Sequence, residues 1–93
     1  MAARGLVKEK EILKEFDASK IEFKDIKFVS CVFENVNFSK SSFYECTFDA
    51  CMFMSCDFAD GFFRNCKISG CKSEGNSFHA CHIRDSVFSE SNF

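Results

Sequence analysis

A period of five residues runs through most of this sequence, and it constrains the fold more than any other feature. Counting in fives from residue 23, fourteen of fifteen positions carry a large apolar side chain, and only Ser73 departs. Twelve of the fourteen phenylalanines fall in this register, while Phe16 and Phe62 lie outside it. The apolar members form a core ladder: Phe23, Phe28, Phe33, Phe38, Phe43, Phe48, Phe53, Phe58, Phe63, Ile68, Phe78, Ile83, Phe88 and Phe93.

All seven cysteines fall in a second register, two residues before the first. They form a small inward ladder: Cys31, Cys46, Cys51, Cys56, Cys66, Cys71 and Cys81. Cysteine behaves as a small hydrophobe in a core, which suits a narrow slot beside stacked phenylalanines. Four polar residues share this register and need backbone hydrogen-bond partners if they are buried. They are Ser41, Asn76, Ser86 and Ser91.

The spacing of the two ladders predicts a coil. Residues two apart in an extended segment point the same way, so both ladders can face inward. The next inward residue is three positions away, so the chain must bend once in every five residues. Repeated short sides and corners make a solenoid whose coils stack at about the 4.8 Å spacing of paired strands. A helix does not fit, because a period of five drifts around a turn of about 3.6 residues.

The sequence resembles the pentapeptide repeat family, whose motif has a central Leu or Phe and a small residue two positions earlier. The resemblance runs from about Ile21 to Phe93 without an insertion. It implies an all-β fold, a right-handed quadrilateral β-helix with four repeats in each coil. The small position, usually Ala in the family, is here mostly Cys. This Cys- and Phe-rich style is similar to family members that confer quinolone resistance, mimic DNA and bind DNA gyrase.

The two ends of the solenoid need cover. Residues 6–16 fit a short amphipathic helix, since Leu6, Ile12, Leu13 and Phe16 fall within an arc of about 120°. We therefore expect an N-terminal helical cap over residues 1–17 and the solenoid over residues 18–93. A partner-binding helix is the alternative for the first segment.

The repeat register continues to the last residue, with no capping helix after it. An uncovered coil would expose Phe88 and Phe93 as an edge that favours association. Either two chains meet end to end there as a homodimer, or the sequence is a fragment of a longer solenoid. Ser73, at a core-ladder position, predicts a cavity or local distortion in the segment 67–77.

No set of residues predicts catalysis, a cofactor or a metal site. The cysteines are spaced unlike the C-x₂-C knuckles of zinc sites and should point into the core. His79 and His82 flank an inward residue and lack the partners of a catalytic set. Phosphate-binding loops, nucleophile elbows and paired-carboxylate clefts are not apparent. We therefore expect a protein that is not an enzyme.

The charge and hydropathy of the sequence limit which classes of partner and which cellular compartment we expect. The formal net charge is −2, from 12 basic and 14 acidic residues, whereas a nucleic-acid-binding domain normally has a basic excess. The N-terminus has neither the apolar region nor the cleavage site of a secretory signal. No apolar run approaches the ~20 residues that span a bilayer. We expect the cytoplasm, where the cysteines stay reduced.

With twenty residues in each coil, one face gathers residue types common in interface hot spots. Lys24, Tyr44, Arg64 and Arg84 share a column bordered by Phe62 and His82. A second patch joins Val32, Met52 and Met54. The position two after each core-ladder residue carries an acidic series: Asp25, Glu45, Asp60, Asp85 and Glu90. The candidate partner-binding residues are Tyr44, Phe62, Arg64, Arg84, Asp25, Glu45 and Asp85.

These observations favour a non-catalytic protein-interaction module. The family resemblance suggests a DNA-mimicking modulator of a topoisomerase such as gyrase. The alternative is a structural or scaffold solenoid, or a piece of a larger repeat protein.

Overall fold

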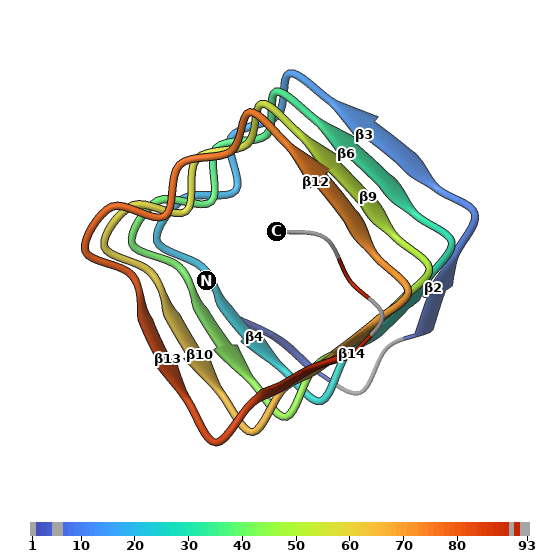
Figure 1. Cartoon of the computed structure of the whole chain (residues 1–93). Coiled ribbons are helices and arrows are strands. Elements are labelled where there is room, and N and C mark those ends of the chain that lie inside the picture. Colours follow the sequence, from blue (N-terminus) through green and yellow to red (C-terminus); the bar gives the residue numbers. More distant parts are fainter. Residues whose placement is uncertain (1, 5–6, 90, 92–93) are drawn as a thin grey trace.

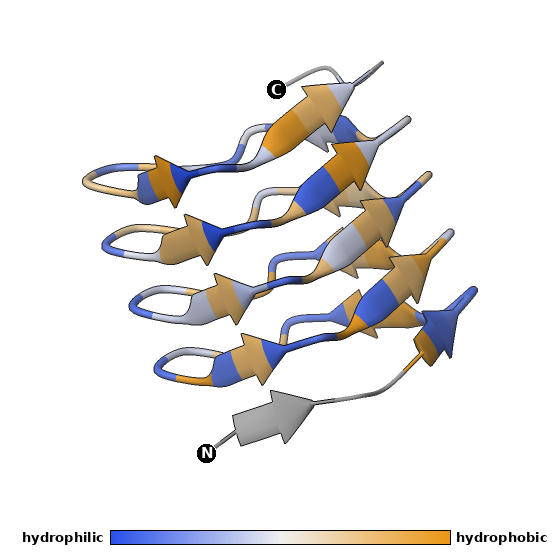
Figure 2. Cartoon of the chain, turned by 90° about the horizontal axis from the view of Figure 1, so that it is seen from below, coloured by the Kyte–Doolittle hydropathy of each residue, from blue (hydrophilic) through white to orange (hydrophobic). Residues whose placement is uncertain are grey.

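The chain winds into a stack of four-sided coils (Figure 1). The computed structural model describes residues 2–4, 7–89 and 91, and these contain fourteen strands of three residues each. Figure 2 shows the coils lying one above another. Across the described residues, no helix has the length and apolar character that crossing a membrane requires.

Three sides of each coil are parallel sheets. The first sheet contains β1 (Ala2–Arg4), β4 (Glu22–Lys24), β7 (Ser42–Tyr44), β10 (Phe62–Arg64) and β13 (His82–Arg84). The second sheet contains β2 (Val7–Glu9), β5 (Lys27–Val29), β8 (Thr47–Asp49), β11 (Lys67–Ser69) and β14 (Val87–Ser89). The third sheet contains β3 (Ile12–Lys14), β6 (Val32–Glu34), β9 (Met52–Met54) and β12 (Lys72–Glu74).

The fourth side is held by single β-bridges that join Asp17 to Asn37, Asn37 to Asp57 and Asp57 to Ser77. The side chain of Asn37 accepts a hydrogen bond from the Ser39 N–H at 2.9 Å, a local bond that competes with extended pairing. A tight turn follows, in which the Ser41 N–H donates to the Phe38 carbonyl at 3.1 Å. Local bonding therefore replaces a full strand on this side.

Each residue lies beside the residue twenty positions away, as in the pair Phe23 and Phe43. Four sides of five residues therefore make one coil. The core ladder stacks ring on ring, with Phe23 and Phe43 centred 4.8 Å apart at an interplanar angle of 6°. Rings from neighbouring sides meet edge to face, as Phe28 and Phe33 do at 5.5 Å and 77°. Such aromatic pairs contribute about 0.5–1.5 kcal/mol each beyond the burial of their area.

The corners use a left-handed backbone at every fifth residue. Fourteen non-glycine residues, from Lys10 to Asp85, have φ between 48° and 59°, and Gly70 and Gly75 hold two further corners. This conformation costs an ordinary L-residue about 1–2 kcal/mol, and Asn and Asp tolerate it best. The cost is offset because corner N–H groups bond to the adjacent coil, as Asn35 does to the Met54 carbonyl at 2.9 Å.

The expected helix over residues 6–16 is wrong for the described part of that segment. Val7–Glu9 and Ile12–Lys14 are strands that pair with β5 and β6 in the twenty-residue register. The open edge of the next coil supplies the hydrogen-bond partners, such as the Val29 carbonyl for the Lys10 N–H at 2.9 Å. A lone helix of about eleven residues is marginal in water. Leu6 lies outside the described residues.

The apolar stripe that suggested this helix does not form a buried face. Two of its members, Ile12 and Phe16, are 63% and 49% exposed. Leu13 and Ala18 continue the core-ladder register and pack inward. Residues 7–17 therefore belong to the same stack of coils as the rest of the described chain, rather than to a separate helical cap.

The core ladder is most deeply buried in the middle of the stack. Nine members are buried: Phe28, Phe33, Phe38, Phe43, Phe48, Phe53, Phe58, Phe63 and Ile68. Phe23 and Phe78 are partly buried. Ile83 and Phe88, on the last described coil, are 45% and 39% exposed, because no described coil covers them. Phe93 lies outside the described residues.

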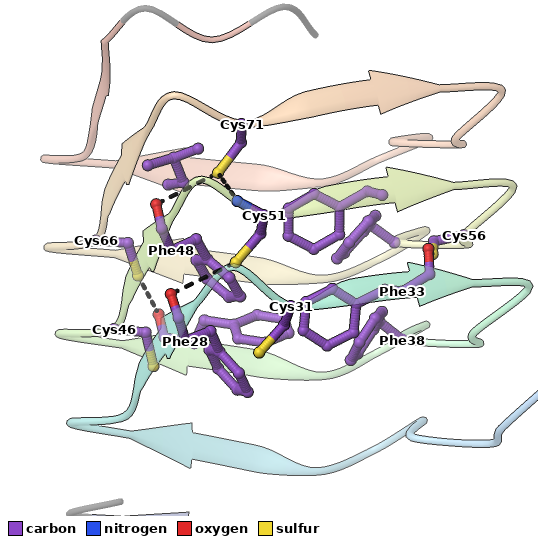
Figure 3. Close-up of a cluster of buried hydrophobic side chains, with 14 of the residues drawn as sticks. Phe28, Cys31, Phe33, Phe38, Cys46, Phe48, Cys51, Cys56, Cys66 and Cys71 are labelled. Atoms are coloured by element: carbon purple, nitrogen blue, oxygen red, sulfur yellow. Dashed lines mark hydrogen bonds between the residues drawn. The ribbon is translucent and has the colours of Figure 1, made fainter. Parts of the chain in front are cut away.

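The small inward ladder bonds to the backbone as well as filling space (Figure 3). The thiol of Cys51 donates to the Phe28 carbonyl, 23 positions earlier, at 3.4 Å. The same bond recurs at 3.3–3.5 Å for the other buried cysteines: Cys31, Cys46, Cys56, Cys66 and Cys71. Ser41 follows the same pattern, since its hydroxyl donates to the Ala18 carbonyl and accepts the Ile21 N–H. The residues of this ladder therefore bond to the backbone of the preceding coil, in addition to filling space in the core.

Ser73 interrupts the core ladder without breaking the coil. It stays in register with Phe53, and its hydroxyl accepts a hydrogen bond from the Asn76 amide. That amide also donates to the Phe53 carbonyl at 3.1 Å and accepts the Cys56 N–H at 2.7 Å. Two polar side chains thus fill part of the space of a phenylalanine. An open hollow of about 600 Å³ lies beside them.

Candidate binding surface

The outer face of the first sheet collects most of the candidate partner-binding residues. Its strands turn their middle residues into the core, so the first and third residues of each strand point outward. The first positions form an outer column of Glu22, Ser42, Phe62 and His82. The third positions form a second column of Lys24, Tyr44, Arg64 and Arg84. The whole surface is called the aromatic–basic face here.

Three rings lie in a row on this face: Phe62 and His82 share one column, and Tyr44 lies diagonal to Phe62. Tyr44 and Phe62, half-buried in neighbouring strands, have ring centroids 5.9 Å apart at an interplanar angle of 43°. His82 continues the row at 6.2 Å from Phe62. Phe62 points outward because Phe63, beside it in β10, is buried in the core. Tyr44 and Phe62 therefore form a partly exposed aromatic surface, which the exposed His82 extends.

Two arginines lie beside this row. Arg64 and Arg84 are register partners on adjacent strands, and both are exposed. Among the described residues the one ion pair joins Lys14 to Glu34 at 3.6 Å, on the third sheet. Neither arginine therefore has a carboxylate partner within the described chain. An open groove of about 450 Å³ runs beside Arg64, lined by Glu22, Lys24, Tyr44, Glu45, Arg64 and Asn65.

Acidic residues border the face at its corner. Asp25, Glu45 and Asp85 take left-handed corner positions next to the column of Lys24, Tyr44 and Arg84. Asn65 interrupts them, since it holds the corner between Glu45 and Asp85. The candidate residues thus lie together: a mainly basic column runs beside a corner column that is acidic except at Asn65.

The expected acidic series divides between corners. Asp60 follows the fourth side and shares its corner with Lys20 and Lys40, away from Asp25. A residue's position within the five-residue repeat does not determine which of the four corners of the coil it occupies. The expectation of one acidic series that includes Asp60 is therefore wrong. Glu90 lies outside the described residues.

The other features identified from the sequence lie elsewhere. Val32, Met52 and Met54 are half-buried on the third sheet, and the two methionines line the hollow beside Ser73. His79 is on the fourth side and His82 on the first sheet, so they do not converge. No three His, Cys, Asp or Glu side chains gather as metal ligands within residues 2–4, 7–89 and 91.

The environment of four of the seven thiols opposes ionisation. Burial raises the pKa of Cys56 and of Cys81. The neighbouring Cys66 thiol and burial together raise the pKa of Cys46, and Cys71 and burial do the same for Cys51. A catalytic cysteine needs a lowered pKa and access to solvent. These four cysteines fit a role in the core instead.

The fold and its repeat define the class of protein, a four-sided β-solenoid of five-residue repeats. The family model for pentapeptide repeats matches residues 31–70 with eight copies. Residues 31–70 therefore carry the repeats of the pentapeptide repeat family. The coils before and after the matched segment continue the same twenty-residue register.

Solved structures share this fold at low sequence identity. A trypsin-treated variant of QnrB1, a plasmid-mediated fluoroquinolone resistance protein, is 20% identical with a TM-score of 0.54. The match covers 100% of this chain and 58% of that one, so this chain spans little more than half of QnrB1. Rfr23, a pentapeptide repeat protein from the cyanobacterium Cyanothece 51142, is 9% identical with a TM-score of 0.55, covering 99% and 90%. No curated protein sequence gives a significant match.

Proposed function

We propose that this chain is a non-catalytic protein-interaction module that binds its partner through the aromatic–basic face. The observation that carries the proposal is the contact row of Tyr44, Phe62 and His82 beside Arg64 and Arg84. Neither arginine forms an ion pair within the part of the chain that the structure describes. Tyrosine and arginine are enriched where binding energy concentrates, with aromatic residues generally enriched at interfaces. The rigid sheet beneath holds these side chains in place, so little ordering cost remains for binding.

Site-specific crosslinking in extracts of the source cells tests this proposal. A photo-crosslinking amino acid replaces His82 on the face, and a control variant carries it at Lys67 on the second sheet. We expect discrete protein adducts from position 82 that Phe62→Ser removes, and no such adducts from position 67. Equal adducts from both positions, or none from position 82, would contradict the proposal.

A second candidate function is modulation of a DNA topoisomerase such as gyrase, through mimicry of DNA. Two observations favour it: the acidic corner residues Asp25, Glu45 and Asp85, and the fold shared with a fluoroquinolone resistance protein. The test adds purified protein to a gyrase supercoiling reaction with and without a fluoroquinolone. Protection that the triple variant Asp25→Asn, Glu45→Gln, Asp85→Asn loses would support this function. Unchanged supercoiling and drug sensitivity would refute it.

We also propose self-association through the C-terminal end of the stack, as a homodimer. Ile83 and Phe88 support it because these two core-ladder side chains are exposed on the last described coil. Sedimentation velocity over a range of concentrations tests this, with Phe88→Ser expected to shift the protein toward monomer. A monomer at every concentration would instead favour a scaffold role or a piece of a longer solenoid.

The compartment we propose is the cytoplasm. The support is that all seven cysteines are free, and six of them are buried. Free thiols persist where glutathione and thioredoxin keep them reduced. Fractionation of source cells, followed by immunoblotting, checks this proposal.

A further inference from the structure

We propose that the aromatic–basic face binds an extended acidic segment of a partner protein, in which acidic residues alternate with apolar ones. Arg64 and Arg84 receive the carboxylates, while Tyr44 and Phe62 pack against the apolar side chains. This inference rests on the proposed function, and it names the chemical class of the partner.

The arginine pair is the first reason for an acidic partner. Arg64 and Arg84 lie directly beside each other on β10 and β13, and like charges at paired positions repel. No carboxylate of the described residues forms an ion pair with either side chain. A bound carboxylate would relieve this repulsion. The planar guanidinium also offers a donor geometry that matches a carboxylate with two parallel hydrogen bonds.

The aromatic row is the second reason, because it points to apolar side chains beside the acidic ones. Tyr44 and Phe62 are half-buried and touch each other, leaving ring surface exposed next to the arginines. Aromatic rings contribute large contact areas at interfaces. A partner made only of acidic residues would leave this apolar surface in water.

The spacing of adjacent coils allows an extended chain to run along the stack. Adjacent coils lie about 4.8 Å apart, and alternate residues of an extended chain lie about 7 Å apart on one side. Flexible arginine side chains on adjacent coils can span that difference. Successive partner residues point to opposite sides. One set would therefore reach the column of Arg64 and Arg84, and the other set the column of Phe62 and His82.

The acidic corner favours a protein partner over a nucleic acid. Asp25, Glu45 and Asp85 border the arginine column along one edge of the face. A phosphate backbone carries charge at every nucleotide and would be repelled along this edge. An alternating peptide places carboxylates over the arginines alone.

Fluorescence anisotropy with a defined probe tests the inference. The probe is a labelled peptide in which Glu alternates with Leu, and its control carries Gln at each Glu position. We expect the Glu peptide to bind at least about tenfold more tightly than the Gln peptide, a difference of ~1.4 kcal/mol. Its affinity should fall as salt screens the charges. Equal binding of both peptides would overturn the proposal.

Matched variants assign the binding to the face. Arg64→Gln/Arg84→Gln should weaken the Glu peptide by at least about tenfold, the loss expected for charge-assisted hydrogen bonds. Lys67→Gln/Lys72→Gln removes the same charge from the second and third sheets and should leave the affinity within about twofold. Equal loss in both variants would contradict a specific site. Circular dichroism checks that each variant keeps the fold.

Three further outcomes distinguish failure of this inference from failure of the proposed function. Tighter binding of single-stranded oligothymidylate through the same arginines would overturn the acidic-protein partner and assign the face to nucleic acid. Protein adducts from position 82 without binding of the Glu peptide would leave the protein-binding face in place and refute its acidic partner. The absence of both adducts and peptide binding would refute both proposals.

Discussion

The thiol of Cys71 lies 3.3 Å from the carbonyl oxygen of Phe48, one coil earlier, and donates a hydrogen bond to it. The same sulfur accepts the N–H of Cys51 at 3.4 Å. A small side chain in this register therefore joins two backbone groups of the preceding coil. The Ser41 hydroxyl joins the Ala18 carbonyl and the Ile21 N–H in the same way.

We predict that serine replaces Cys71 better than alanine does. Ser keeps a donor and an acceptor, whereas Ala leaves the Cys51 N–H without its acceptor and opens a small void. Leaving a buried polar group unpaired costs about 1–3 kcal/mol. Cys71→Ala should therefore have a free energy of unfolding at least ~1 kcal/mol below that of Cys71→Ser. Urea titrations of both variants measure this, and equal stabilities would show that the thiol only fills space.

Thiol accessibility should follow the position of each cysteine in the stack. Cys81 is half-buried on the last described coil that carries a cysteine, while the other six are buried. We expect a thiol reagent to label Cys81 first and the other six only after unfolding. Mass spectrometry of the labelled native protein gives the order. Rapid labelling of Cys51 or Cys56 in the folded protein would contradict the inward ladder.

Stability should decline at alkaline pH because of the buried Cys56 thiol. Burial raises the pKa of Cys56 above its ordinary value of 9.0 in the folded state. The folded state then holds its proton while the unfolded state releases it. This contribution is fully present below pH 9.0 and is lost as the pH rises toward the folded pKa. Urea titrations between neutral and alkaline pH should show the decline, and Cys56→Ser should reduce it. An identical pH profile for Cys56→Ser would refute the assignment.

Gly61 should be intolerant of a side chain despite its ordinary backbone conformation. A Cβ there would meet the Phe58 carbonyl oxygen at 2.9 Å and the Ser41 carbonyl oxygen at 3.3 Å. We expect Gly61→Ala to lower the free energy of unfolding by about 1–3 kcal/mol, as overpacking does. The control is Gly70→Asn, at a corner conformation that Asn35 and Asn65 already adopt. Thermal unfolding should show a clear loss for the first variant and little for the second.

Restoring the core ladder at Ser73 should stabilise the solenoid. Ser73→Phe alone would extend the ring stack on Phe53, but would remove the hydroxyl that the Asn76 amide contacts. Adding Asn76→Cys restores the usual pair of ladders. We expect the double variant to gain about 1–3 kcal/mol by burying the ring, and to exceed Ser73→Phe alone. No gain from the double variant would show that the missing ring at position 73 does not weaken the fold.

The sequence predicts the inward ladders well because they obey a local rule. Phe33 and Cys31 lie two residues apart in one extended side, and nothing distant is needed to orient them. The strands at Val7–Glu9 and Ile12–Lys14 could not be predicted in this way. Four apolar residues also fit a helix, and the partners that favour strands lie twenty residues away. The right-handed sense of the coil stays a prediction.

The binding face was partly predictable. The twenty-residue coil brings Tyr44 beside Arg64, and the neighbouring Phe63 turns Phe62 outward. The diagonal contact between Tyr44 and Phe62 depends on side-chain conformations that no repeat pattern contains. The thiol hydrogen bonds were missed, although Ser41 and Ser86 in the same register were a signal that the position can bond to backbone.

The central claim is that the aromatic–basic face binds a protein partner, and a titration of that partner tests it most directly. The protein crosslinked from position 82 is purified and titrated by calorimetry with the wild type and with Phe62→Ser. We predict that Phe62→Ser binds at least about tenfold more weakly, as loss of a central aromatic contact would cause, with its unfolding temperature unchanged. Undiminished affinity of a folded Phe62→Ser variant would contradict the claim.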